Sequence, residues 1–201
     1  MIARPNRAEE TYLPRDSFMK IRPRDFQTCG FRFTIIPVMS KGDYPVTPAV
    51  RALRDHKASF APHLYDYQEH GGTARSASEL GVDEHAVIKT LVMETDRREP
   101  LIILMHGDRE VSTKELARAI GAKTVVPCKP DVAQKHTGYM VGGTSPFGTR
   151  KRLPVYAERT IFDLPTIYIN GGKRGFLVSL DPQVLKAVLP VTEVAVAIPS
   201  H

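Results

Sequence analysis

From residue 45 onward, apolar and polar positions alternate in short blocks that are bounded by glycine, proline or helix-capping residues. Thr47-Pro48 and Asp181-Pro182 have the composition of helix starts, and the Ser/Glu spacings at 76–79 and 112–115 have the form of capping boxes. Gly81, Gly121 and Gly138 are expected to end helices, the last of them over residues 131–136. Apolar blocks predict strands at residues 59–67, 87–93, 101–105, 166–170, 176–180 and 194–198.

These elements follow one another without a regular strand–helix–strand rhythm. The order therefore predicts an α+β domain with a largely antiparallel or mixed sheet, and not a doubly wound parallel fold. We place this domain at residues 44–201. Residues 1–43 lack sustained periodicity apart from a strand-like piece at 31–36, and we expect a basic, partly disordered extension there.

Composition narrows the class of protein. The chain is 42% hydrophobic and 25% charged, as expected of a globular domain, and it has no apolar run long enough to cross a bilayer and no secretory-type segment. We therefore expect a cytoplasmic protein with no membrane partner.

Cys29 and Cys128 are far apart in the sequence, which favours two free thiols. No metal-ligand spacing is present, so we expect no metal and no cofactor.

The net charge of +6 is compatible with an anionic partner such as nucleic acid, although many proteins that bind no nucleic acid are equally basic. Charge alone would support only a general nucleic-acid-binding protein, whose affinity would depend strongly on salt. More specific signals come from four short segments.

The most unusual segment is residues 138–148, which hold four glycines and one proline. Glycine lets a backbone approach a ligand closely, and amides in such a loop can converge on an anion or an oxyanion; a structural turn would have the same composition. Ser145 does not fit a hydrolase elbow, because Pro146 has no N–H to donate and Phe147 replaces the second glycine.

Lys89 stands inside the apolar strand 87–93, where its ammonium must reach water or an anion. It is either a lysine whose stem runs along apolar surface to water or a cation directed at a substrate.

The segment 171–175 is a glycine-rich basic turn without P-loop spacing, and 149–152 is a basic run directly after the glycine loop.

Together these segments resemble the YbaK/ProX family of aminoacyl-tRNA editing domains. The resemblance extends from Val46 to Ile198. It rests on Thr-Pro-Ala-Val at 47–50, Val-Ile-Lys-Thr-Leu at 87–91, Gly-Ala-Lys at 121–123, Thr-Gly-Tyr-Met-Val-Gly-Gly-Thr-Ser-Pro-Phe-Gly at 137–148, Lys-Arg-Leu-Pro at 151–154 and Ile-Tyr-Ile-Asn-Gly-Gly-Lys-Arg-Gly at 167–175.

The resemblance implies a compact, barrel-like sheet surrounded by short helices. It also implies metal-independent hydrolysis of the ester between a wrong amino acid and the 3′ end of tRNA. The implied partners are mischarged tRNA and a synthetase, prolyl-tRNA synthetase or another. The implied catalytic residues are Lys89, Gly142, Gly143 and Thr144; the implied substrate-binding residues are Tyr65, Ser145, Pro146, Asn170, Gly171 and Leu177.

Removal of cysteine from proline tRNA is the activity that the resemblance favours. Relatives with that activity often carry an Asp where this chain has Leu177, and a small hydroxyl residue where it has Asn170. The sequence therefore leaves two alternatives open: a deacylase for Ala-, Ser- or Thr-tRNA, and a non-catalytic module that binds tRNA or a synthetase.

Overall fold

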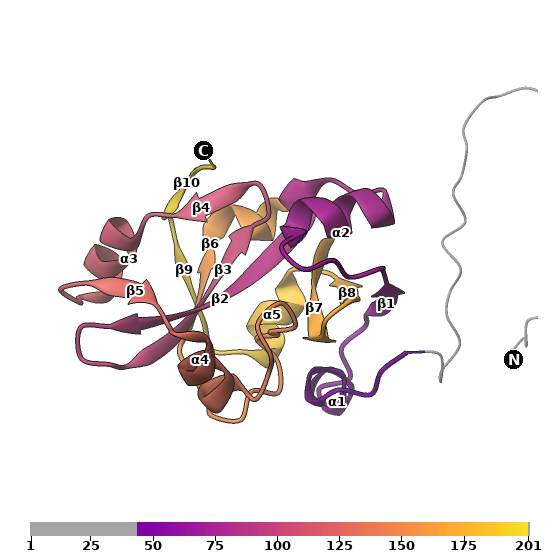
Figure 1. Cartoon of the computed structure of the whole chain (residues 1–201), viewed down its shortest axis with the longest axis horizontal. Coiled ribbons are helices and arrows are strands. Elements are labelled where there is room, and N and C mark those ends of the chain that lie inside the picture. Colours follow the sequence, from indigo (N-terminus) through magenta and orange to yellow (C-terminus); the bar gives the residue numbers. More distant parts are fainter. Residues whose placement is uncertain (1–43, 201) are drawn as a thin grey trace, which may run out of the picture. The chain divides into compact units, whose positions relative to one another are not determined.

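The computed structural model describes residues 44–200 (Figure 1). The proposed extension 1–43, its strand-like piece and Cys29 lie outside the described residues. Within the described part, no helix is both long and apolar enough to span a membrane.

A mixed eight-stranded sheet forms the centre of the fold, with the long strands β2 and β3 in its middle (Figure 1). The strand order is β1-β8-β7-β2-β3-β6-β9, and β5 pairs with β2. The strands are β1 (Ala61–Leu64), β2 (Val87–Thr95), β3 (Pro100–His106), β5 (Val125–Pro127), β6 (Val155–Glu158), β7 (Ile167–Lys173), β8 (Phe176–Leu180) and β9 (Val191–Val194). A second sheet pairs β4 (Arg109–Val111) with β10 (Ala197–Pro199).

The predicted α+β class is confirmed. In the large sheet, β1–β8, β8–β7, β2–β3 and β2–β5 pair antiparallel, whereas β2–β7, β3–β6 and β6–β9 pair parallel. Short helices pack around the sheet: α1 (Pro48–Asp55), α2 (Gly72–Leu80), α3 (Thr113–Ile120), α4 (Pro130–Thr137) and α5 (Gln183–Val188), with 3₁₀ turns at Glu84–Ala86 and Arg159–Asp163.

Most predicted helix ends are present. The Thr47 hydroxyl accepts a hydrogen bond from the Val50 amide at the start of α1, and the Ser112 hydroxyl accepts one from the Glu115 amide at the start of α3. Gly81, Gly121 and Gly138 end α2, α3 and α4 in the left-handed conformation that glycine tolerates.

The predicted capping box at 76–79 is wrong, because α2 already begins at Gly72. Ser76 lies within the helix and donates to the Thr73 carbonyl, and Glu79 forms an ion pair with Arg75 one turn earlier. The Ser-x-x-Glu spacing therefore occurs here in the helix interior, where its acidic residue pairs with a residue four positions away.

The strand predictions need three corrections. The first strand is shorter than 59–67, the expected strand 194–198 is divided between β9 and β10, and β4, β5 and β6 were not predicted. The missed strands have only three or four residues each, too few for a periodic signal.

Both faces of the central strands are covered. On β3, Ile102 and Leu104 pack into one apolar cluster with α1 and α5, while Ile103 and Met105 pack into another with α3. Burial on both faces explains why this strand is a continuous apolar run in the sequence.

Candidate functional site

A groove follows one edge of β2. That strand pairs with β3 from Ile88 to Glu94, but its other edge pairs with β7 only at Val87 and Ile88 and with β5 only at Met93 to Thr95. The intervening edge lines a cavity of about 890 Å³. Because the lining residues include all of Val87 to Met93, the groove runs about 20 Å along the strand.

Lys89 lines the middle of this groove. Its Nζ donates to the Arg109 carbonyl oxygen at 2.9 Å. A lysine ammonium has three N–H donors. Among the described residues no second acceptor is recorded for Nζ, so two donors are available to a ligand.

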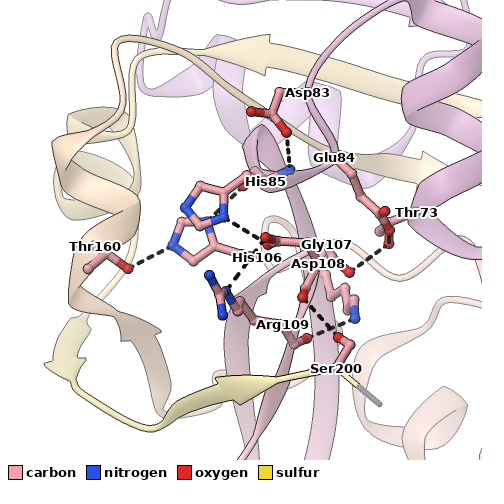
Figure 2. A network of polar contacts seen from close by, with 11 residues as sticks. Thr73, Asp83, Glu84, His85, His106, Gly107, Asp108, Arg109, Thr160 and Ser200 are labelled. Carbon is pink, nitrogen blue, oxygen red and sulfur yellow. Dashed lines mark hydrogen bonds and ion pairs between the residues drawn. The ribbon is translucent and has the colours of Figure 1, made fainter.

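A polar network fixes the segment that holds Lys89 (Figure 2). The Asp108 carboxylate accepts from the His85 Nδ1 at 2.8 Å and pairs with the Arg109 guanidinium at 3.5 Å. The Ser200 hydroxyl donates to the Asp108 carbonyl. These contacts hold residues 108–109, and therefore the carbonyl that orients Lys89, in one position.

His106 supports the same network from the core. Its ring is fully buried and stacks on His85 with 3.7 Å between centroids. Nδ1 lies 2.7 Å from the His85 carbonyl and must donate to it, so Nε2 of the neutral ring accepts from the Thr160 hydroxyl. Burial lowers the pKa of His106, which keeps the ring neutral near pH 7.

The glycine loop 138–148 forms another wall. Asn170 donates through its side-chain amide to the Gly142 carbonyl at 3.2 Å, and Arg174 Nε donates to the Val141 carbonyl at 2.8 Å. The Arg174 guanidinium also lies over the Tyr67 ring. The loop is thus tied to the hairpin of β7 and β8.

The catalytic loop residues expected from sequence differ in their surroundings. Gly142 and Thr144 line the groove, whereas Gly143 is buried and its amide donates to the Met140 carbonyl at 2.9 Å. For the amides of Gly142, Thr144 and Ser145, no acceptor is recorded among residues 44–200. Of these, the amides of Gly142 and Thr144 lie in residues that line the groove, so they, and not that of Gly143, are free to bind a substrate oxygen in this conformation.

The substrate-binding residues expected from sequence divide in the same way. Tyr65, Asn170 and Leu177 line the groove, but Ser145, Pro146 and Gly171 are buried and do not. The Ser145 hydroxyl accepts from the Phe147 amide at 3.4 Å, which is the behaviour of a turn residue.

The wall near the start of β2 is apolar. Leu177 packs there with Val87 and Ala77, and Tyr65 lies against the same cluster. Burial raises the pKa of the Tyr65 hydroxyl, so it is a neutral donor at physiological pH. A ligand group placed against Leu177 would meet hydrocarbon on that side.

Thr90 is a groove residue that sequence reasoning missed. Its hydroxyl is buried and has no hydrogen-bond partner in the described part of the chain. The Cys128 amide donates to the Val92 carbonyl, which shows that even-numbered positions of β2 direct their backbone groups toward the open edge. Thr90 therefore directs its backbone N–H and C=O toward the groove, while its hydroxyl stays buried without a partner. Its only sequence signal was its place next to Lys89.

The groove also contains one thiol. Burial raises the pKa of Cys128 to about 11, so at neutral pH the thiol is protonated and a poor nucleophile. Between residues 44 and 200, no three His, Cys, Asp or Glu side chains gather in a way that could hold a metal ion.

Comparison with known families identifies the class. The family described as "Aminoacyl-tRNA editing domain" matches residues 69–188, which include β2, the glycine loop and the β7–β8 hairpin. The chain belongs to this family.

Individual relatives agree with that assignment. The chain is 31% identical over 147 residues to EbsC of Enterococcus faecalis, whose name describes a candidate Cys-tRNA(Pro)/Cys-tRNA(Cys) deacylase; the match covers 73% of this chain and 88% of EbsC. It is 27% identical over 138 residues to a proline–tRNA ligase of Streptococcus equi, covering 69% of this chain but 21% of the ligase.

Solved structures show the same fold. A protein described as a candidate trans-editing enzyme for prolyl-tRNA synthetase matches with a TM-score of 0.66 at 19% identity, over 77% of this chain and 99% of that one. The hypothetical protein APE2540 matches with a TM-score of 0.69 at 18% identity, over 76% of this chain and all of the other.

Proposed function

We propose that this chain is a deacylase that hydrolyses the ester linking a wrong amino acid to the 3′ end of tRNA, with cysteine on proline tRNA as its first substrate. The observation that carries the proposal is the groove itself. In a chain of the aminoacyl-tRNA editing family, one cavity joins the Lys89 ammonium to the free amides of the glycine loop.

Lys89 binds the terminal nucleotide. The Arg109 carbonyl orients its ammonium, and the two remaining N–H donors are directed to the terminal ribose or phosphate. Because the network around Asp108 fixes that carbonyl, the charge is positioned before the substrate arrives.

The glycine loop stabilises the transition state. When water attacks the ester carbonyl carbon, negative charge develops on the carbonyl oxygen, and the amides of Gly142 and Thr144 are available to bind it. Gly143 instead allows the loop to pack against the β7–β8 turn, since a β-carbon there would lie 2.9 Å from the Arg174 amide nitrogen. The ribose oxygen leaves with the proton that the attacking water loses.

Proton transfer relies on the substrate. Cys128 is protonated and Ser145 is buried outside the groove, so neither is suited to covalent catalysis. The neighbouring ribose hydroxyl, or the thiol of a cysteinyl ester, can relay the proton. Positioning and charge stabilisation then supply the remaining rate enhancement.

The apolar wall at Leu177 favours a small side chain without a hydroxyl. Burying a serine or threonine hydroxyl against it without a partner costs about 1–3 kcal/mol. A cysteine thiol is a weak hydrogen-bonding group and loses less. Alanine fits the same wall, so Ala-tRNA is the main rival substrate.

Hydrolysis of Cys-, Ala-, Ser- and Thr-esters on proline tRNA and on their cognate tRNAs tests the proposal. We expect turnover, fastest with cysteine, and a 10²- to 10³-fold lower kcat/KM in Lys89→Met, about the effect of removing one charge-stabilising donor. Lys57→Met is the matched control, because Lys57 is exposed and does not line the groove. Turnover of no ester, with intact tRNA binding, would instead indicate a binding module.

A synthetase partner is a second part of the proposal. Its support is the similarity to proline–tRNA ligases and to the solved structure of a candidate trans-editing enzyme. Adding prolyl-tRNA synthetase to the hydrolysis assay should raise the rate at subsaturating tRNA if the synthetase presents the substrate.

A further inference from the structure

Positive charge is concentrated at one end of the groove. Between residues 129 and 152 the chain carries five Lys/Arg and one Asp, a net charge of +4, against +6 for the whole chain. The cations are Lys129, Lys135, Arg150, Lys151 and Arg152, all exposed, and we refer to them as the basic patch.

Two backbone hydrogen bonds bring these residues together. The Arg150 amide donates to the Thr137 carbonyl and the Lys151 amide to the His136 carbonyl, both at 3.0 Å. The basic run after the glycine loop therefore lies against the C-terminal turn of α4. Lys151 and Lys135 both lie close to His136, because the two charges add to the effect of burial in lowering the pKa of that histidine.

The patch is not neutralised from within the described part of the chain. The six ion pairs found between residues 44 and 200 involve none of its five cations. Two carboxylates lie nearby: Asp131 in the first turn of α4, and Glu94, which is paired with Arg98. Four unbalanced charges thus face solvent.

The patch continues the groove at its β5 end. The groove is lined there by Pro127, Cys128 and Ala133, and the last of these lies on α4 between Lys129 and Lys135. The opposite end, beside α2, is lined by Glu69 and Glu84. This asymmetry of charge defines one direction in which a polyanion can leave the groove.

We propose that the basic patch binds the phosphate backbone of the tRNA acceptor stem while the 3′-terminal nucleotide occupies the groove. The placement of the 3′ end rests on the proposed function; the affinity of the patch for RNA does not. Exposed lysines and arginines on a helix end and an adjacent loop suit backbone phosphates, which carry no sequence information. Selectivity for the tRNA body would then come from elsewhere.

Binding of two uncharged RNAs tests the proposal: a hairpin with an acceptor stem and a CCA end, and the CCA trinucleotide alone. The variant is Lys135→Gln/Arg150→Gln/Lys151→Gln, and fluorescence anisotropy at increasing KCl is the measurement. We expect about tenfold weaker hairpin binding, a slope of log affinity against log salt that is smaller by about 2–3, and unchanged trinucleotide binding.

The control variant is Lys57→Gln/Arg97→Gln/Lys123→Gln, which removes three exposed cations that do not line the groove. It should bind both RNAs like the wild type, and thermal melting should show both variants folded. Unchanged hairpin binding in the patch variant, or an equal loss in the control, would overturn the proposal and leave an acidic protein surface as the alternative partner. Because no ester is hydrolysed, this result is independent of the deacylase assay.

Discussion

At the scale of single residues, the glycine loop depends on how closely it approaches its neighbours. A β-carbon on Gly143 would lie 2.9 Å from the Arg174 amide nitrogen and 3.1 Å from the Lys173 carbonyl carbon. A β-carbon on Gly142, whose φ is +84°, would lie 2.8 Å from the Tyr67 hydroxyl. Backbone atoms cannot withdraw as a flexible side chain can, so Gly143 is the stricter requirement.

Gly143→Ala should therefore displace the loop. We expect kcat to fall at least tenfold, because the amides move relative to the ester, while overpacking costs about 1–3 kcal/mol of stability. Single-turnover deacylation and thermal melting measure the two effects. Gly81→Ala, with φ of +65° at the end of α2 and outside the groove, should lower stability without changing kcat.

Leu177 sets the range of amino acids. Leu177→Ala should enlarge the cavity beside Val87, destabilise the fold by about 2–5 kcal/mol and raise the relative kcat/KM for larger or hydroxylated esters. The matched control is Leu185→Ala: this leucine is fully buried but does not line the groove. If Leu177→Ala loses about as much stability as Leu185→Ala and leaves the order of substrates unchanged, Leu177 only packs the core.

At the scale of secondary structure, Thr47 connects α1 to the sheet. Its hydroxyl accepts from the Val50 amide at 3.1 Å and donates to the Gly171 carbonyl of β7. One side chain therefore caps the helix and ties it to the strand that carries Asn170, which in turn holds the glycine loop.

Replacing Thr47 by valine removes both hydrogen bonds at nearly constant volume. We expect a loss of about 1–3 kcal/mol in the free energy of unfolding, measured by urea denaturation, because the buried Gly171 carbonyl and the Val50 amide each lose a partner. Thr47→Ser keeps the hydroxyl and should stay close to the wild type. If serine and valine are equally destabilising, packing of the methyl group is the larger contribution.

At the scale of the whole molecule, buried histidines link stability to pH. Burial lowers the pKa values of both His63 and His106 from the ordinary 6.5. Below pH 6.5 the unfolded chain therefore binds more protons than the native one. The contribution of the two neutral histidines to stability is complete above that pH, and it is lost as the pH falls toward their pKa values in the folded state.

Stability should thus decline on acidification below about pH 6.5, by up to about 1.4 kcal/mol per pH unit for each proton taken up. His106→Gln should flatten this decline, at the cost of the bonds to His85 and Thr160. Melting temperatures between pH 5 and 8 measure the effect, and the exposed His56→Gln serves as control. A decline of equal steepness in His106→Gln would assign the pH dependence to other groups.

Features that depend on residues close together in the sequence could be predicted from it. The cap at Thr47, the capping box at Ser112 and the glycine helix ends follow from local hydrogen bonding, and the apolar runs of β2 and β3 from burial on both faces. The same local rule failed at Ser76, because the Ser-x-x-Glu spacing also occurs inside a helix, where Glu79 pairs with Arg75.

The sequence by itself determined the α+β class, the family and the two segments that carry Lys89 and the glycine loop, since these depend on local patterns and motifs. Only the tertiary structure decided that these segments line one groove. The groove exists because β7 and β5 pair with opposite ends of β2, and that pairing depends on contacts between residues far apart in the chain. The unpaired hydroxyl of Thr90, the anchoring of Lys89 by Arg109 and the use of the Gly143 amide within its own turn all follow from that packing.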